Sequence, residues 1–158
     1  MSTAAAKDIH ISDSPKIFAG EFRHAIDPKN RVTIPSRWRR GDADEFFLVL
    51  SQGQTHLVAF PPAEFESVGR DIMAKSQFSE AQRRVFVRQF YAKAQHCVMD
   101  KQGRLVLPVE LTKSAGIQGE TVLVGNMTRF EFWNPKAWNA ECQETGATYE
   151  AMAASFGL

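Results

Sequence analysis

The sequence predicts an α+β fold in which strands predominate, built from two tandem copies of one small module. The main observation is an internal repeat, because a shift of 73 residues aligns identical residues in one gap-free register. The identical pairs are Asp27/Asp100, Arg31/Arg104, Pro35/Pro108, Val49/Val122, Leu50/Leu123, Thr55/Thr128 and Pro62/Pro135. The second observation is that strand-forming runs and turn residues follow the same order in both copies. Two copies indicate a duplicated module, since a solenoid needs about three or more stacked repeats.

Each copy is predicted to begin with a strand that ends at a tight turn. Both turns, 27–30 and 100–103, start with Asp, and their last residue, Asn30 or Gly103, suits a positive φ. A second strand follows, and Pro35 or Pro108 then begins a short helix that Gly41 or Gly116 is placed to stop. The predicted strands are 18–26, 31–34, 46–51 and 56–60, then 95–99, 104–107, 121–125 and 129–133, with short helices at 36–40 and 109–115.

Helical segments are predicted after each copy. Pro62 and Pro135 suit a first helical position, and Asn134 is a favourable N-cap. The run Ser79–Gln82 has the form of a capping box, and a weak terminal helix is expected over 146–158. The expected division is an N-terminal tail (1–16, disordered), a first module (17–62), a helical segment (63–93), a second module (94–135) and a C-terminal helical segment (136–158).

Composition excludes several classes of protein. With 44% apolar and 23% charged residues the chain is not of a disordered kind, and no apolar run approaches the ~20 residues of a membrane span. Two cysteines without C-x-x-C spacing favour a reducing cytoplasm. The histidines and cysteines lack the spacing of a metal site, and no phosphate-binding loop or nucleophile–base pair is present. We therefore expect no enzyme, no metal or other cofactor, no small-molecule ligand and no membrane partner.

The near-neutral net charge of +1 hides a basic N-terminal third. Residues 15–41 hold seven Lys or Arg against two acidic residues, whereas 42–79 hold two against six. A basic region of this kind suits a polyanion such as nucleic acid, but it also suits a solvated face whose charges cancel against acidic neighbours in the fold.

The two Asp-x-x-x-Arg turns carry the most specific chemistry. A carboxylate aimed at DNA would be repelled, so Asp27 and Asp100 are expected to accept turn amides or to hold the arginine. Arg31 and Arg104 would then offer a fork of donors to phosphate oxygens or to a guanine edge. The alternative is that each pair only pins a turn, but two copies in one register favour nucleic acid.

Together these residues resemble the MraZ family of bacterial regulators. The resemblance covers roughly Ile17 to Glu141 and rests on Phe18-x-Gly20, Asp27-x3-Arg31-x3-Pro35, Arg37-Trp38-Arg39, Asp100-x2-Gly103-Arg104-Leu105-x2-Pro108, Ala115-Gly116, Val122–Gly125 and Phe130-Glu131-x-Trp133. It implies two AbrB-like swapped-hairpin modules in a pseudo-twofold, barrel-like unit. It also implies a cytoplasmic, nucleoid-associated transcription factor that binds tandem promoter repeats of the division and cell-wall gene cluster as a homo-oligomeric ring.

The resemblance places the DNA-contacting arginines at Arg31 and Arg104. The full set of candidate DNA-binding residues is Arg31, Arg104, Lys29, Lys101, Arg37, Arg39 and Arg40, and the candidate structural residues of the turns are Asp27, Asn30, Asp100 and Gly103. Two departures from the family pattern stand out: Asn30 replaces the usual glycine, and a tail of about sixteen residues precedes the usual start. The copies also differ from each other, since Thr112 stands where the first copy has Arg39. The alternative function is an AbrB-like antitoxin or assembly module whose main partner is another protein.

Overall fold

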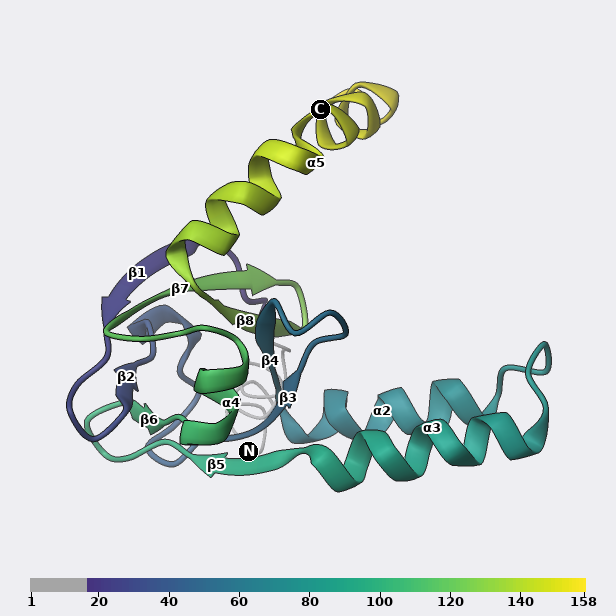
Figure 1. The fold of residues 1–158 in the computed structure, drawn as a ribbon, viewed down its shortest axis with the longest axis horizontal. Helices are drawn as coiled ribbons and strands as arrows, with labels where there is room; N and C mark the ends of the chain where they lie inside the picture. Colours follow the sequence, from purple (N-terminus) through teal and green to yellow (C-terminus); the bar gives the residue numbers. More distant parts are fainter. Residues whose placement is uncertain (1–16) are drawn as a thin grey trace, which may run out of the picture.

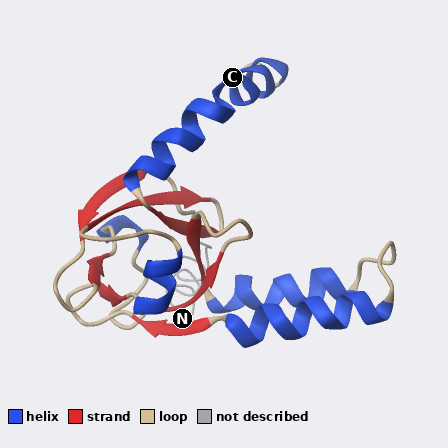
Figure 2. Ribbon diagram, viewed as in Figure 1, coloured by secondary structure: helices blue, strands red, loops and turns tan. Residues whose placement is uncertain are grey.

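The computed structural model describes residues 17–158, so the predicted tail over 1–16 lies outside the described residues. Figure 1 gives the order of the elements and Figure 2 their types. The first copy contains β1 (Glu21–Ala25), β2 (Arg31–Thr33), the 3-10 helix η1 (Ser36–Trp38), β3 (Glu45–Leu50) and β4 (His56–Phe60). The helices α2 (Pro62–Met73) and α3 (Glu80–Lys93) follow. The second copy contains β5 (Gln95–Val98), β6 (Arg104–Val106), α4 (Val109–Ser114), β7 (Glu120–Asn126) and β8 (Arg129–Trp133), and α5 (Pro135–Ser155) completes the chain.

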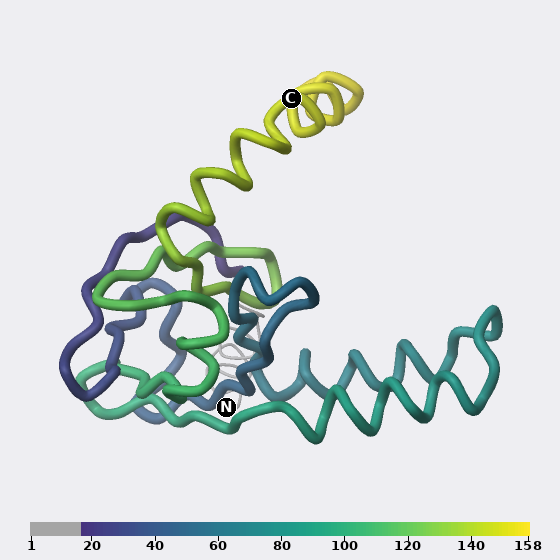
Figure 3. The backbone as a smooth tube through the Cα atoms, viewed as in Figure 1, coloured from purple at the N-terminus to yellow at the C-terminus, as the bar shows by residue number. Residues whose placement is uncertain are grey.

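The two copies exchange strands. Six strands form one sheet in the order β1-β7-β8-β4-β3-β5, and β2 pairs with β6 in a separate two-stranded ribbon. The first strand of each copy therefore pairs with the third strand of the other, β1 with β7 and β5 with β3. The course of the chain through the two copies can be followed by colour in Figure 3. This is the swapped arrangement that the resemblance implied. The described strands leave β1 and β5 as sheet edges, so they do not close into a barrel.

One hydrophobic core serves both copies. Val32 and Leu105 face each other in the β2–β6 ribbon, and both are fully buried. Trp38 lies near the rings of Phe18 and Phe130, with centroids 5.6 and 5.1 Å away, and its indole N–H donates to the carbonyl of Ala19 at 3.0 Å. Because residues of both copies line this core, neither copy buries its own apolar face alone.

The gap-free repeat register is wrong for the third strands. In the sheet Phe47 pairs with Phe60, whereas Val122 pairs with Trp133. Since Phe60 and Trp133 correspond by the 73-residue shift, Phe47 corresponds to Val122, which is a shift of 75. The first hairpin has the longer connection, 51–55 against 127–128, and the segment between the second and third strands is shorter in the first copy, 34–44 against 107–119. The identities at Val49/Val122 and Leu50/Leu123 therefore do not mark equivalent positions.

The predicted short helices differ between the copies. The second is α4, and it ends at Ser114, two residues before Gly116, whose φ of 66° suits glycine. The first is only the turn η1, because Arg39 is already extended and the backbone N–H of Arg40 donates to the Asp44 carboxylate at 2.7 Å. The prediction that Gly41 ends a helix is therefore wrong.

The longer helices project from the sheet in two directions (Figure 1). The capping box at Ser79 and Gln82 and the N-cap at Asn134 are confirmed. The hydroxyl of Tyr91 in α3 donates to the Phe65 carbonyl of α2 at 2.6 Å, which ties these two helices together. The helical segment predicted after Pro135 and the weak terminal helix expected over 146–158 are one helix, because α5 runs without a break from Pro135 to Ser155. Its glycine costs only about 1 kcal/mol in a helix interior of otherwise favourable residues.

Candidate nucleic-acid interface

The two candidate arginines lie on one face of the β2–β6 ribbon. In this antiparallel pair Arg31 is opposite Val106, and Thr33 is opposite Arg104. Side chains alternate between the faces of a strand, so these four share one face and the buried Val32 and Leu105 share the other. Val106 is 54% exposed, which marks the face with the arginines as the outer one. The arginines are the first residues of their strands, not residues of the turn tips.

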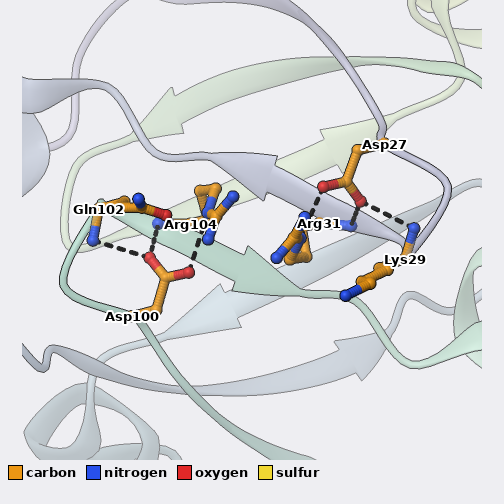
Figure 4. Close-up of polar contacts among 6 residues, drawn as sticks. All are labelled: Asp27, Lys29, Arg31, Asp100, Gln102 and Arg104. Carbon is orange, nitrogen blue, oxygen red and sulfur yellow. Dashed lines mark hydrogen bonds and ion pairs between the residues drawn. The ribbon is translucent and has the colours of Figure 1, made fainter.

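Asp27 organises the first turn and orients Arg31 (Figure 4). Its Oδ1 accepts the backbone N–H groups of Lys29 at 3.0 Å and Arg31 at 2.9 Å. Its Oδ2 accepts the Nε–H of Arg31 at 2.6 Å. The bond from the Arg31 backbone is the main cause that keeps the pKa of Asp27 below its ordinary value, so the carboxylate is ionised at neutral pH.

The second turn repeats this geometry around Asp100 (Figure 4). Oδ1 accepts the N–H groups of Gln102 and Arg104, each at 2.9 Å, and Oδ2 accepts the Arg104 Nε–H at 2.9 Å. The backbone bond from Arg104 is again the main cause of the lowered Asp100 pKa. Seventy-three residues apart, the two turns thus make the same set of bonds.

The outer ends of both guanidinium groups remain available. Each arginine uses Nε for its aspartate, and within residues 17–158 neither Nη atom of Arg31 or Arg104 has a protein hydrogen-bond partner. Their side chains are 26% and 30% exposed, as expected of an arginine that is held through Nε while the end of its guanidinium group reaches solvent. Lys29 and Lys101 are exposed residues of the two turns. Four cations therefore lie on or beside the outer face of the ribbon.

The other three candidate cations contact the protein elsewhere. The guanidinium of Arg37 lies over the Phe22 ring at 5.2 Å, and that of Arg40 over the Phe18 ring at 5.8 Å. Both residues are exposed. Arg39 is half-buried, and its Nε donates to the carbonyl of Ile34 at 2.9 Å. Its guanidinium also lies so close to Gly103 of the second copy that a Cβ there would overlap it, which places Arg39 in the packing between the copies.

The turn residues Asn30 and Gly103 both have positive φ, 61° and 79°. Asn30 also reaches into the second copy, where its Nδ2 donates to the Leu107 carbonyl at 2.6 Å and to Thr112 Oγ1 at 3.3 Å. This contact between the copies has no signal in the sequence, and the position of Thr33 on the outer face was not predicted. Alternation along the strand was the signal that would have found Thr33.

Within residues 17–158 no three His, Cys, Asp or Glu side chains gather closely enough to hold a metal ion. In the same part of the chain, no helix combines the length and the apolar character that crossing a bilayer requires.

A further polar cluster lies at the centre of the large sheet. His56 stacks on Trp133 and approaches Glu131, with Nε2 and Oε2 3.5 Å apart. Burial would raise the pKa of Glu131, but bonds from His56, from Trp133 Nε1 at 2.9 Å and from Asn126 at 3.3 Å lower it.

The fold and the ribbon define a class of protein in which two interleaved swapped-hairpin copies each present one arginine that is held by an aspartate. A family model described as "MraZ protein, putative antitoxin-like" matches residues 17–89 and again 90–155. The chain is 39% identical to a transcriptional regulator MraZ of Carboxydothermus hydrogenoformans, over 87% of this chain and 94% of the relative. It is 38% identical to the protein of that name in Symbiobacterium thermophilum, over 88% and 99%. In Pediococcus pentosaceus the identity is 35%, over 90% and 100%. The chain belongs to the MraZ family.

Proposed function

We propose that this protein is a sequence-specific DNA-binding transcriptional regulator that reads DNA with the outer face of the β2–β6 ribbon. The observation that carries the proposal is the pair of arginines on that face, each oriented by an aspartate through Nε while its Nη atoms are accessible. The relatives named above are called transcriptional regulators, which supports the same conclusion.

The ribbon suits the major groove of B-DNA. That groove is about 12 Å wide and admits a two-stranded β-ribbon. Arg31 and Arg104 are diagonal neighbours across the ribbon, and such neighbours lie about 7–8 Å apart. This spacing corresponds to about two base-pair steps of 3.4 Å, so each arginine can contact a different guanine through O6 and N7. Thr33 and Val106, on the same face, are placed to contact base edges or a thymine methyl group.

The lysines of the turns would bind phosphates beside the ribbon. Lys29 and Lys101 are exposed and carry compact charges that fit phosphate oxygens. Arg37 and Arg40 are further candidates for phosphate contacts. Each phosphate neutralised contributes about −0.9 to the slope of log K against log salt concentration. One protein chain with this few contacts would bind DNA weakly at physiological salt.

Several copies acting together would overcome this weakness. We infer that the protein forms a homo-oligomeric ring and binds tandem short repeats in the promoter of the division and cell-wall gene cluster. Linked sites raise affinity through effective concentration without new contacts. Val85 and Phe86 on α3 are 51% and 43% exposed and border an open apolar groove of about 1200 Å³. Apolar surface of this kind supports a protein contact, here one between subunits.

The alternative is an antitoxin or assembly module that acts through another protein, in line with the family description. That function does not need accessible guanidinium tips on both turns. It predicts that loss of Arg31 and Arg104 leaves the main interaction of the protein unchanged.

A binding titration separates these functions. Fluorescence anisotropy would measure binding to DNA from upstream of the protein's own gene and to a shuffled duplex of equal length. Arg31→Ala with Arg104→Ala is expected to abolish specific binding while the elution volume on a sizing column stays the same. Arg84→Ala is the matched control, since Arg84 is an exposed arginine paired to Glu80 on α3. Wild-type affinity in the double variant would refute the proposal.

Replacing both arginines by lysine distinguishes base contacts from phosphate contacts. Lysine keeps the charge but lacks the planar fork that matches a guanine edge. We expect this variant to bind the upstream and the shuffled duplex with similar affinity. A preserved preference for the upstream duplex would show that the guanidinium forks do not read the sequence.

A further inference from the structure

Two pseudo-symmetric contacts join each arginine-bearing turn to the other copy of the module. At the first contact the turn of copy one meets α4 of copy two, and the Leu107 backbone N–H donates to the Asn30 carbonyl at 2.8 Å. At the second contact the turn of copy two meets the segment after β2, and the Ile34 N–H donates to the Gly103 carbonyl at 2.8 Å. The backbone contacts are the same, because these residues correspond by the 73-residue shift.

The side chains at the two contacts are different but satisfy the same acceptor. At the first contact the Leu107 carbonyl accepts from Asn30 on the turn, and the opposing position holds the small, buried Thr112. At the second contact the Ile34 carbonyl accepts from Arg39 on the opposing segment, and the turn holds Gly103. A Cβ added at Gly103 would overlap the Arg39 guanidinium.

The two sites thus divide the roles in opposite ways. At the first contact the donor is Asn30 on the turn, and the residue facing it, Thr112, is small. At the second contact the donor is Arg39 on the facing segment, and Gly103 on the turn has no side chain. Asn30, which stands where the resemblance implies a glycine, and Thr112, which stands where the first copy has Arg39, therefore form one contact. We propose that the Asn30–Thr112 and Gly103–Arg39 contacts form a pairing code, which makes copy one fit copy two and disfavours pairing of like copies from two chains.

The preference follows from the residues that would meet if two first copies, or two second copies, paired with each other. Two first copies would place Asn30 against Arg39, and their side chains would compete for one space and one carbonyl. Two second copies would place Gly103 against Thr112, which leaves a buried carbonyl without its donor. Leaving a buried acceptor unsatisfied weakens the pairing about fivefold or more. Swapped modules without such distinctions are open to exchange between chains.

Two substitutions recreate these mismatches inside one folded chain. Thr112→Arg gives Asn opposite Arg, and Asn30→Gly gives Gly opposite Thr. The double variant has the combination already present at Gly103 and Arg39. Arg39 is extended (ψ 139°) whereas Thr112 lies inside α4, so the two residues differ in ψ, but the φ of Arg39, −81°, is near the helical value. Since φ sets where Cβ leaves the preceding backbone, a side chain at position 112 starts in a similar direction. The positive φ of Asn30 is one that glycine adopts freely.

The test is a double-mutant cycle on the full chain, followed by urea unfolding at one protein concentration. We expect Thr112→Arg to raise the unfolding equilibrium constant about tenfold or more and Asn30→Gly about fivefold. The double variant should lie within about threefold of the wild type, which is a strong departure from additivity. Lys113→Arg, an exposed position on the same helix, is the control and should combine additively with Asn30→Gly.

Additive effects of the two substitutions would refute the pairing code. If the two substitutions add, so that the double variant unfolds as readily as the product of the singles, the pairing code is refuted. If Thr112→Arg alone does not fold, recovery of folded protein in the double variant supports the code and failure to recover refutes it. The measurement needs no DNA, so its outcome is independent of the proposed function.

Discussion

Truncation of Leu105 to alanine tests whether the β2–β6 ribbon has the two faces assigned to it. Leu105 is fully buried, and its partner Val32 is fully buried as well. Removing three carbons at about 0.8 kcal/mol for each buried CH₂ gives about 2.4 kcal/mol. The cavity left in a core shared by both copies raises the loss to about 3–4 kcal/mol, within the range for such truncations. Val106→Ala, at the next residue but on the outer face, should cost less than about 1 kcal/mol.

Urea unfolding followed by far-UV circular dichroism measures both variants at one protein concentration. With a slope of about 2 kcal/mol per molar urea, Leu105→Ala should lower the midpoint by about 1.5–2 M and Val106→Ala by less than about 0.5 M. Equal shifts for the two variants, or a larger shift for Val106→Ala, would show that the buried and outer faces are wrongly assigned. The arginines would then not lie on a common exposed face.

Two further predictions concern titrating groups away from the ribbon. Because the pKa of Glu131 is lowered in the folded protein, its contribution to stability should be present above the ordinary value of 4.5 and lost as the pH falls below it. Glu131→Gln should therefore lose less stability than the wild type between pH 7 and pH 3 in urea melts, and an equal loss would contradict the assignment. Burial raises the pKa of the Cys97 thiol to about 11, whereas Cys142 is exposed. Iodoacetamide at pH 8 should modify Cys142 quickly and Cys97 only on unfolding, as mass spectrometry of the peptides would show; equal labelling would mean that Cys97 is accessible.

The local elements could be predicted because their determinants are local. Asp at the start of each turn, Pro35 and Pro108 after each short strand, and the capping box at Ser79 fix backbone conformation within a few residues. Pairing between distant strands has no such signal in one sequence. The exchange of β1 and β5 between the copies was implied by the family resemblance and not by any spacing.

The repeat led to one wrong prediction, the alignment of the third strands of the two copies. Compensating length changes on the two sides of β3 and β7 left the identities at Val49 and Leu50 in a plausible but displaced alignment. A strand repeats its faces every two residues, so a displacement of two residues preserves the pattern of buried and exposed positions. The sequence pattern therefore could not reveal the displacement of two residues.

The candidate site shows the same limit. The positions of Arg31 and Arg104 in the motif could be predicted, but their common face depends on the register of β2 against β6. Arg39 looked like one more surface cation, whereas contact with Ile34 and Gly103 makes it part of the packing. That contact joins residues of both copies, and no single-chain pattern brings them together.

The most direct test of the central claim is methylation protection of guanine N7, which lies in the major groove. The purified protein, bound to the DNA upstream of its own gene, should protect guanines at regularly repeated positions, and Arg31→Ala with Arg104→Ala should remove this protection while the oligomer persists. Unchanged protection by the double variant, or binding that leaves every guanine N7 reactive, would contradict the claim that the arginine-bearing face of the ribbon reads DNA.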